Sequence, residues 1–217
     1  MLALFDLDGT LVDSAPGIWA SIRAAAAELG LPRPTPDQLR AMVGPPLQEG
    51  FAATFGLTGA DVVRAVDAYR AHYAAGAMLD ATVYAGIPEL LAELADGGAT
   101  LAVATSKPEP FALRLLEHTG LRAAFASVHA ATLDGRIRHK HQVVGAALAV
   151  HAERPAVLVG DRTQDVEGAA AHGIPCIGAG WGPAEDGELA AAGAVVAATP
   201  GEVPGAVELL LADAPRS

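Results

Sequence analysis

Short apolar runs alternate with segments of helical periodicity along most of the chain. The runs are apolar at successive positions, which is typical of strands buried on both faces of a parallel sheet. The segments between them carry apolar residues at helical spacing and commonly end at a glycine. The predicted strands are Leu2 to Leu7, Ala99 to Thr105, Ala156 to Gly160, Ile174 to Gly178 and Ala194 to Ala198, with Phe125 to Val128 as a weaker candidate.

Four helices are predicted between these strands. One begins near Pro88 and ends at Gly97, and the others cover Phe111 to His118, Lys140 to Ala152 and Asp165 to His172. Strands that alternate with helices in this way predict an α/β fold. We therefore expect a doubly wound, Rossmann-like parallel sheet with helices on both faces.

One stretch, from Ser14 to about Asp80, shows helix signals and no clear strand. Ser14 can cap a helix that has Pro16 in its first turn and ends near Gly30. A capping box is expected at Thr35 to Gln38, and a further helix at Ala60 to Ala75. The sequence thus predicts a small α-helical cap, residues 15–80, inserted after the first strand of a core formed by residues 1–14 and 81–217.

Composition and charge narrow the classes of function. The chain of 217 residues is 52% hydrophobic and 18% charged, so it can bury a core. Its net charge of −11 argues against a nucleic-acid polymer as partner, because such binding needs a basic surface. A small anion can still bind where a metal ion and a few cations reverse the local field.

Cysteine use and hydropathy predict a cytoplasmic protein. Cys176 is the only cysteine, so no intramolecular disulfide can form, which suits a reducing compartment. No secretory signal is visible, and no apolar run is long enough to span a membrane. We expect a monomer or homodimer without membrane association.

Candidate chemistry begins with the string from Phe5 to Thr10, which reads Phe-Asp-Leu-Asp-Gly-Thr. Asp6 and Asp8 lie at the carboxyl end of the first predicted strand, where open α/β sheets bind ligands. Strand alternation would point both carboxylates to one side, where Mg²⁺ could join them. An isolated Asp-x-Asp is more often a polar turn, but the full string is far more specific.

This string resembles the first motif of the haloacid dehalogenase-like superfamily, Asp-x-Asp-x-Thr, with Asp6, Asp8 and Thr10 at the matching positions. Further phrases resemble its phosphoglycolate phosphatase and 5′-nucleotidase-like branch, which carries a helical cap after the first motif. They are Phe5 to Ile18, Gly86 to Leu90, Val103 to Phe111 and Gly160 to Gly178. Gln164 departs from the basic residue or histidine expected in close relatives.

The second and third family motifs can be placed by order along the chain. Thr105 closes an apolar strand, and the resemblance implies that its hydroxyl and the backbone N–H of Ser106 bind phosphoryl oxygens. Thr10 is expected to be a third phosphate-binding residue. The alternative is an ordinary helix start, because residues 106–109 also fit a capping box. Lys140 is the expected third-motif lysine that neutralises nucleophile and phosphate, and Lys107 is its competitor.

The fourth motif follows the strand Ala156 to Gly160. The resemblance makes Asp161 a direct metal ligand and gives Asp165 a supporting role toward the metal or the lysine. Read without the family, Asp165 is an acid favoured at a helix start. Four motifs in the right order, each after an apolar run, are hard to explain by chance.

Together these residues imply a Mg²⁺-dependent phosphatase acting on a small phosphorylated metabolite. Asp6 would attack phosphorus and form an aspartyl-phosphate, and Asp8 would act as general acid and base. Mg²⁺ would be bound by Asp6, Asp161 and the backbone carbonyl of Asp8. Substrate specificity is expected on the cap, where Gly44, Pro45 and Pro46 form either a rigid loop at the site or a plain linker.

Three rival functions use related residues. A dehalogenase of the same superfamily needs no metal and no proton donor at the second position, so Asp8 and Asp161 count against it. A phosphomutase of the β-phosphoglucomutase type would keep all four motifs. A phospho-receiver signalling domain also uses Mg²⁺, aspartate, threonine and lysine, but its phosphorylated aspartate follows a later strand and no helical insert follows the first.

Overall fold

The computed structural model describes residues 1–212 and divides the chain into two compact units. The first unit comprises Met1–Val12 and the chain from Val83 onward, and the second comprises Asp13–Thr82. The predicted insert, residues 15–80, lies inside the second unit, which begins two residues earlier and ends two residues later. The strands β2 (Val12–Asp13) and β3 (Thr82–Val83) pair with each other where the chain passes between the units.

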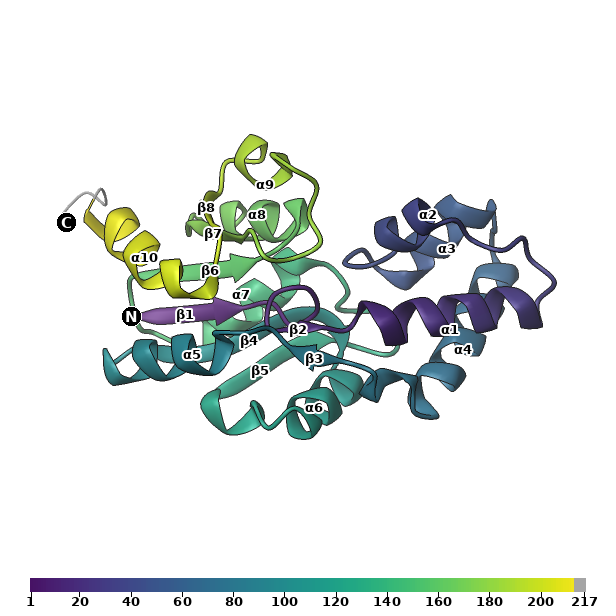
Figure 1. Cartoon of the computed structure of the whole chain (residues 1–217), viewed down its shortest axis with the longest axis horizontal. Helices are drawn as coiled ribbons and strands as arrows, with labels where there is room; N and C mark the ends of the chain where they lie inside the picture. The colour runs from purple at the N-terminus through teal and green to yellow at the C-terminus, as the bar shows by residue number, and fades with distance from the viewer. Residues whose placement is uncertain (213–217) are drawn as a thin grey trace. The chain divides into compact units, whose positions relative to one another are not determined.

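A six-stranded sheet with parallel pairing forms the centre of the first unit (Figure 1). Every residue of the inner strand β1 (Leu2–Phe5) is buried, because its successive apolar side chains meet helices on both faces of the sheet. This α/β, Rossmann-like architecture confirms the predicted fold class. In spatial order the strands are β5 (Ser127–Ala131), β4 (Thr100–Pro108), β1 (Leu2–Phe5), β6 (Ala156–Gly160), β7 (Cys176–Ala179) and β8 (Val195–Ala197).

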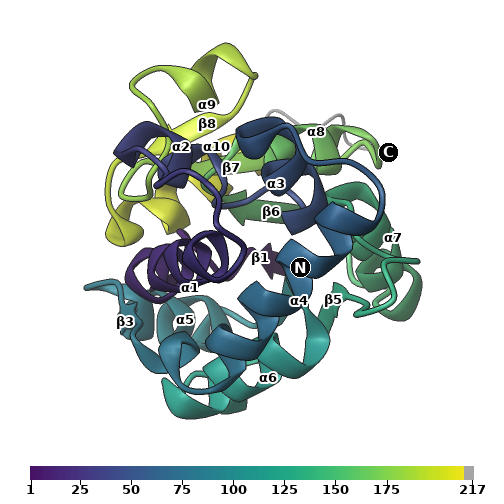
Figure 2. The same cartoon turned by 90° about the vertical axis from the view of Figure 1, so that its right-hand side faces the viewer.

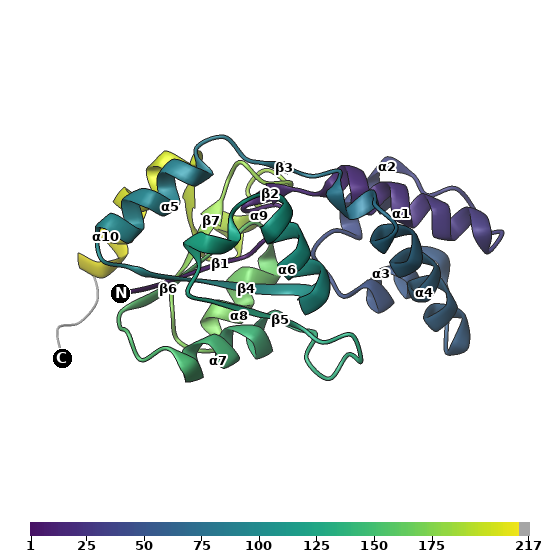
Figure 3. The same cartoon turned by 90° about the horizontal axis from the view of Figure 1, so that it is seen from below.

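Helices cover both faces of the sheet. In Figure 3 the strands run between α5 (Ile87–Asp96) on one side and the pair α7 (Lys140–Val150) and α8 (Thr163–Ala170) on the other. The pair α7 and α8 packs on a core cluster that includes Leu2, Leu4 and Leu158. The remaining elements are α6 (Glu109–His118), η2 (Arg122–Ala124), α9 (Glu188–Ala191), η3 (Pro200–Glu202) and α10 (Val203–Ala212).

Strand order explains where a site can form. β1 lies between β4 and β6, and the later strands continue outward from it in opposite directions. The carboxyl end of β1 is therefore the point at which the order reverses, and open α/β sheets bind ligands there. The loops that follow β1, β4 and β6 all begin at this edge of the sheet.

The second unit is helical, and its residues 14–81 contain no strand. Its core is aromatic: Phe51, Tyr69 and Tyr73 are buried, and Tyr69 contacts both of the other rings. Figure 2 labels its four α-helices, which are α1 (Ala15–Glu28), α2 (Pro36–Ala41), α3 (Leu47–Phe55) and α4 (Ala60–Ala74). The short helix η1 (Ala77–Leu79) follows α4.

Two of the predicted helix starts differ in their capping. The capping box at Thr35 forms as expected, with Thr35 accepting from the backbone of Gln38. Ser14 occupies the N-cap of α1 but makes no side-chain capping bond, and the Asp13 carboxylate instead accepts from the Ala15 N–H. Asp13 lies outside the helix signal, so the sequence pattern favoured the wrong side chain.

The capping box considered for residues 106–109 is absent. β4 continues through Pro108, and α6 begins at Glu109 with Pro108 as its N-cap residue. The strand continues three residues past Thr105, the end of the predicted run, and Lys107 in this extension is buried. The helices α3, α9 and α10 were not predicted. Among the described residues, no helix combines the length and hydropathy needed to cross a membrane.

Candidate active site

The loop after β1 turns sharply around Gly9. Gly9 has φ 87°, and a Cβ atom there would lie 2.3 Å from Asp161 Oδ2. Only glycine combines this conformation with so close an approach. The loop thereby brings the first motif against the end of β6.

Asp6 forms a buried ion pair with Lys140. Lys140 Nζ lies 2.8 Å from Asp6 Oδ1 and 2.7 Å from Asp165 Oδ1, and it also donates to the Ala104 carbonyl at 3.0 Å. The Leu7 N–H donates to the same Asp6 oxygen at 2.7 Å. The orientation of the Asp6 carboxyl group is therefore fixed from two directions.

The packing of α7 against α8 places Lys140. A Cβ atom on Gly168 of α8 would lie 2.5 Å from the Lys140 Cγ atom, so the glycine makes room for the lysine stem. Lys140 is the first residue of α7, and its side chain is only 4% exposed. Burial lowers the pKa of Lys140, but the carboxylates of Asp165 and Asp6 outweigh it and hold that pKa above its ordinary value.

Asp161 is fully buried at the end of β6. Its Oδ1 accepts a hydrogen bond from Thr10 Oγ1 at 2.8 Å, while Oδ2 has no hydrogen-bond partner within the described part of the chain. Thr10, expected among the phosphate-binding residues, is itself fully buried and gives its hydroxyl to Asp161. In this structure Thr10 supports an acidic side chain rather than facing an open site.

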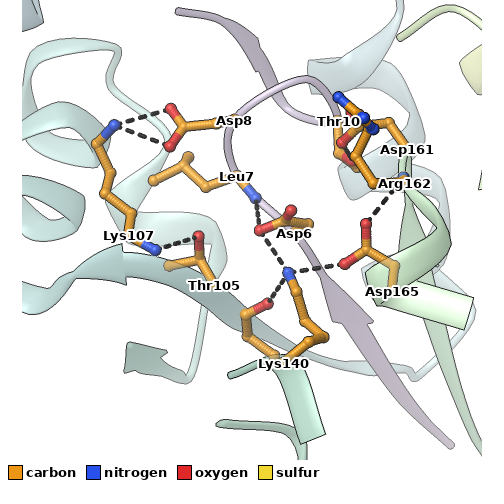
Figure 4. Close-up of polar contacts among 11 residues, drawn as sticks. Asp6, Leu7, Asp8, Thr10, Thr105, Lys107, Lys140, Asp161, Arg162 and Asp165 are labelled. Atoms are coloured by element: carbon orange, nitrogen blue, oxygen red, sulfur yellow. Dashed lines mark hydrogen bonds and ion pairs between the residues drawn. The ribbon is translucent and has the colours of Figure 1, made fainter. Parts of the chain in front are cut away.

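Asp6, Asp161 and Asp165 form a buried acidic cluster whose ligand atoms lie within 4.8 Å of one another (Figure 4). Burial raises the pKa of Asp6 to about 6, although Lys140 opposes the shift. Burial and then the charges of Asp165 and Asp6 raise the pKa of Asp161 well above its ordinary value. If all three acids ionise beside one ammonium, two negative charges stay uncompensated, and buried charge of that kind is costly.

The donor set fits a hard divalent cation. All three candidate ligands are carboxylates, and magnesium favours oxygen ligands over nitrogen or sulfur. The unpartnered Asp161 Oδ2 faces Gly9, where any side chain would fill the space. A divalent ion bound here would also balance the two remaining charges.

The Asp8 carboxylate points away from this cluster (Figure 4). Lys107 Nζ donates to Asp8 Oδ1 and Oδ2, both at 2.8 Å, and the two side chains are 4% and 14% exposed. Strand alternation predicted that Asp6 and Asp8 would point the same way. β1 ends at Phe5, however, so alternation does not extend to Asp8.

Thr105 and Ser106 lie on β4 beside Lys107. The Lys107 N–H donates to Thr105 Oγ1 at 3.2 Å, which uses the hydroxyl oxygen as an acceptor and does not consume its proton. Thr105 is buried and Ser106 is half-buried. Their role toward phosphate stays a prediction. Gly44, Pro45 and Pro46 lie in the α2–α3 loop of the second unit, and their role in substrate specificity also stays a prediction.

A carboxylate that sequence reasoning missed, Glu188, holds the fourth motif. Glu188 Oε1 accepts from Arg162 Nε at 3.3 Å, from the Thr163 N–H at 3.2 Å and from Thr163 Oγ1 at 3.1 Å. The Arg162 N–H donates to Asp165 Oδ2 at 3.0 Å. The signal was absent because Glu188 lies 25 residues beyond Thr163 in a segment without a motif.

The chain is similar in sequence to several known proteins. It is 46% identical over 183 residues to the tyrosine-protein kinase PtkA of Mycobacterium tuberculosis, a match that covers 83% of this chain but 62% of the kinase. It is 38% identical to a 5′-nucleotidase of Pseudomonas aeruginosa, covering 87% and 86% of the two chains. It is 33% identical to a phosphoglycolate phosphatase of Agrobacterium fabrum, covering 83% and 81%.

A solved structure of similar length has the same fold. A crystal structure of a predicted phosphatase from Clostridium acetobutylicum superposes with a TM-score of 0.91 at 35% identity, covering 96% of this chain and 98% of that one. The family model described as haloacid dehalogenase-like hydrolase matches residues 3–179, which include all four motifs. The chain therefore belongs to the haloacid dehalogenase-like hydrolase family.

Proposed function

We propose that this protein is a Mg²⁺-dependent phosphomonoesterase that acts on a small phosphorylated metabolite through an aspartyl-phosphate at Asp6. The observation that carries the proposal is the Asp6–Lys140–Asp165 network beside Asp161, at the strand-order reversal of the sheet. The similarity to a 5′-nucleotidase and to phosphoglycolate phosphatases supports the same class of substrate.

Asp6 is the nucleophile in this proposal. Its carboxyl group is held at Oδ1 by Leu7 and Lys140, which leaves Oδ2 as the oxygen that attacks phosphorus. The new Asp6 O–P bond forms as the bond from phosphorus to the leaving oxygen breaks. Lys140 and Thr105 stabilise the charge of the phosphoryl group during transfer.

Magnesium is the proposed cofactor, held by Asp6, Asp161 and the backbone carbonyl of Asp8. When bound, it supplies positive charge to the phosphoryl oxygens. Asp165 holds Lys140 and the Arg162 N–H, which keeps the cluster in place from the other side.

Asp8 is the general acid and base in this proposal. It gives a proton to the leaving oxygen in the first half-reaction and takes one from water in the second. For this exchange its carboxyl group must reach the leaving oxygen, whereas Asp6 must stay in line with phosphorus. Two carboxylates held by different lysines fit these two roles.

Replacement of each carboxylate tests the proposal. Asp6→Asn should abolish both turnover and the phosphoryl adduct, which is measured as intact-protein mass after quenching with substrate and Mg²⁺. Asp8→Asn should slow an alkyl phosphate by about 10²–10⁴-fold, the usual contribution of acid–base assistance, and a nitrophenyl phosphate by much less. An Asp6→Asn protein that still forms the adduct and turns over would refute the mechanism.

A second candidate is transfer of the phosphoryl group from Asp6 to a tyrosine hydroxyl. It is favoured by the 46% identity to a protein named as a tyrosine kinase, although the match spans 62% of that protein. The same adduct would then be discharged by the phenolic oxygen in place of water, with Asp8 as the base. Release of inorganic phosphate in the presence of a tyrosine peptide, compared with formation of phosphotyrosine, separates the two functions.

A further inference from the structure

The proposed function does not specify in which half-reaction the ion pair between Lys107 and Asp8 acts. One ammonium donates to both carboxylate oxygens at the same distance, 2.8 Å, and both side chains are largely buried. Charge-assisted hydrogen bonds in such surroundings are strong and fix the orientation of the carboxylate.

The backbone of β4 is distorted where it presents Lys107. Thr105 pairs with Ala130 and Pro108 pairs with Ala131, so β4 advances by three residues while β5 advances by one. Irregularities of this kind re-aim side chains beside functional sites. Thr105 and Lys107 are both buried at this point, and Figure 4 shows Lys107 extending to Asp8 on the side opposite Lys140.

The double contact limits how the Asp8 side chain can move. Lys107 donates to both Asp8 oxygens, so the carboxyl group is held at two points. Departure of a good leaving group needs little protonation, whereas activation of water in the second half-reaction needs a base for every ester. The second half-reaction is therefore the step that depends most on the position of Asp8.

We infer that Lys107 is a positioning residue that holds Asp8 as the base for hydrolysis of the aspartyl-phosphate. This inference rests on the proposed function. In that step the water oxygen forms a bond to phosphorus, the Asp6 O–P bond breaks, and the water proton passes to an Asp8 oxygen. Lys107 keeps its hydrogen bond to the other Asp8 oxygen throughout this step. It therefore acts through Asp8 and does not touch the reacting atoms.

Lys107→Met tests the inference, because it keeps the length of the side chain and removes its charge. With a nitrophenyl phosphate and Mg²⁺, nitrophenol release in the first turnover should be unchanged, since that leaving group departs with little protonation. Decay of the adduct should slow about tenfold, a part of the contribution of a positioned base. The adduct fraction during turnover, read as intact-protein mass, should rise accordingly.

Three control proteins separate positioning from a general loss of charge or structure. Lys107→Arg keeps a cation that can donate to both oxygens and should restore decay of the adduct. Arg136→Met removes a cation from the exposed Arg136–Asp134 pair and should behave as the parent protein. In an Asp8→Asn background, Lys107→Met should slow decay no further, because residues that act together are not additive.

The outcomes are distinguishable. Unchanged decay of the adduct in Lys107→Met would overturn the inference. The inference would also fail if Lys107→Met slowed decay as much in the Asp8→Asn background as it does in the parent protein. A raised KM with slow first-turnover release would mean that Lys107 binds substrate and would also overturn it. If the parent protein itself forms no adduct and releases no phosphate from any ester, the proposed function fails instead.

Discussion

Lysine is used sparingly in this chain, and both of its lysines lie at the first motif. The chain has 14 basic residues, of which only Lys107 and Lys140 are lysines. Lys140 pairs with Asp6, and Lys107 pairs with Asp8. A compact ammonium fits between crowded carboxylates, whereas the planar guanidinium of arginine needs a wider, fork-shaped partner.

Replacement of Lys140 should lower both turnover and the stability of the fold. Lys140→Ala should lower turnover by about 10²–10³-fold, the loss expected for one preorganised charge donor. It also leaves Asp6 and Asp165 buried without their shared cation, so the free energy of unfolding should fall by roughly 3–5 kcal/mol. Turnover of an aryl phosphate and a urea-unfolding curve measure the two effects.

Lys140→Arg is the matched control for that loss. It keeps the positive charge and should retain more of the stability than Lys140→Ala, but turnover should stay low because the fork does not fit the site. Parent-like turnover in Lys140→Ala would show that the ammonium has no part in phosphoryl transfer.

Short elements late in the chain stabilise the fourth motif. α9 has four residues, yet its first residue, Glu188, accepts from the Thr163 N–H at the start of α8. The first N–H groups of a helix lack partners within the helix, so a carboxylate from elsewhere can cap it. The cap joins two helices around the loop that carries Asp161.

Loss of this cap should lower the free energy of unfolding by a measurable amount. Glu188→Ala should lower the free energy of unfolding by about 1 kcal/mol, the usual cost of losing a capping side chain. It should also weaken Mg²⁺ binding, because Arg162 and Thr163 adjoin Asp161. Denaturant unfolding and a Mg²⁺ titration test both effects.

Glu167 offers the control for Glu188, because it is an exposed acid on α8. Glu167→Ala should change the free energy of unfolding by no more than about 0.5 kcal/mol, as exposed substitutions usually do. If Glu167→Ala weakens Mg²⁺ binding as much as Glu188→Ala does, overall charge and not the cap explains the effect.

At the scale of the whole molecule, the acidic cluster couples metal binding to stability. Asp6 directly follows β1, Asp161 directly follows β6 and Asp165 lies in α8, so the three are brought together only when the sheet forms. Their mutual repulsion destabilises the folded chain without a cation. A metal that binds only the folded chain should therefore stabilise it.

Thermal unfolding tests this coupling. Mg²⁺ at 100 times its dissociation constant should stabilise the parent protein by about 2.7 kcal/mol and raise its Tm. Asp161→Asn should abolish the rise, and without metal it should be at least as stable as the parent because it removes a buried charge. Asp186→Asn, at an exposed position, should keep the response. An undiminished rise in Asp161→Asn would place the metal elsewhere.

The sequence by itself determined the architecture of the sheet and predicted where the four motifs lie. Apolar runs and helical periodicity are local signals, so the six predicted strands correspond to β1 and β4 to β8, and the helical insert was located. Asp6, Thr105 and Asp161 were predicted from apolar runs, and Lys140 from a helix start after the Asp134–Gly135 turn, all in the order of the family's motifs. The helices α3, α9 and α10 were not predicted because none of them begins at a clear capping signal in the sequence.

Only the tertiary structure decided which side chains meet. That Lys107 pairs with Asp8, 99 residues away, depends on the pairing of β1 with β4 and on the irregular end of β4. Thr10 turned inward to Asp161, 151 residues away, and Glu188 reached the start of α8. Local patterns fix which residues form an element, but the partners of a buried charge are set by burial and by neighbours that are distant in the sequence.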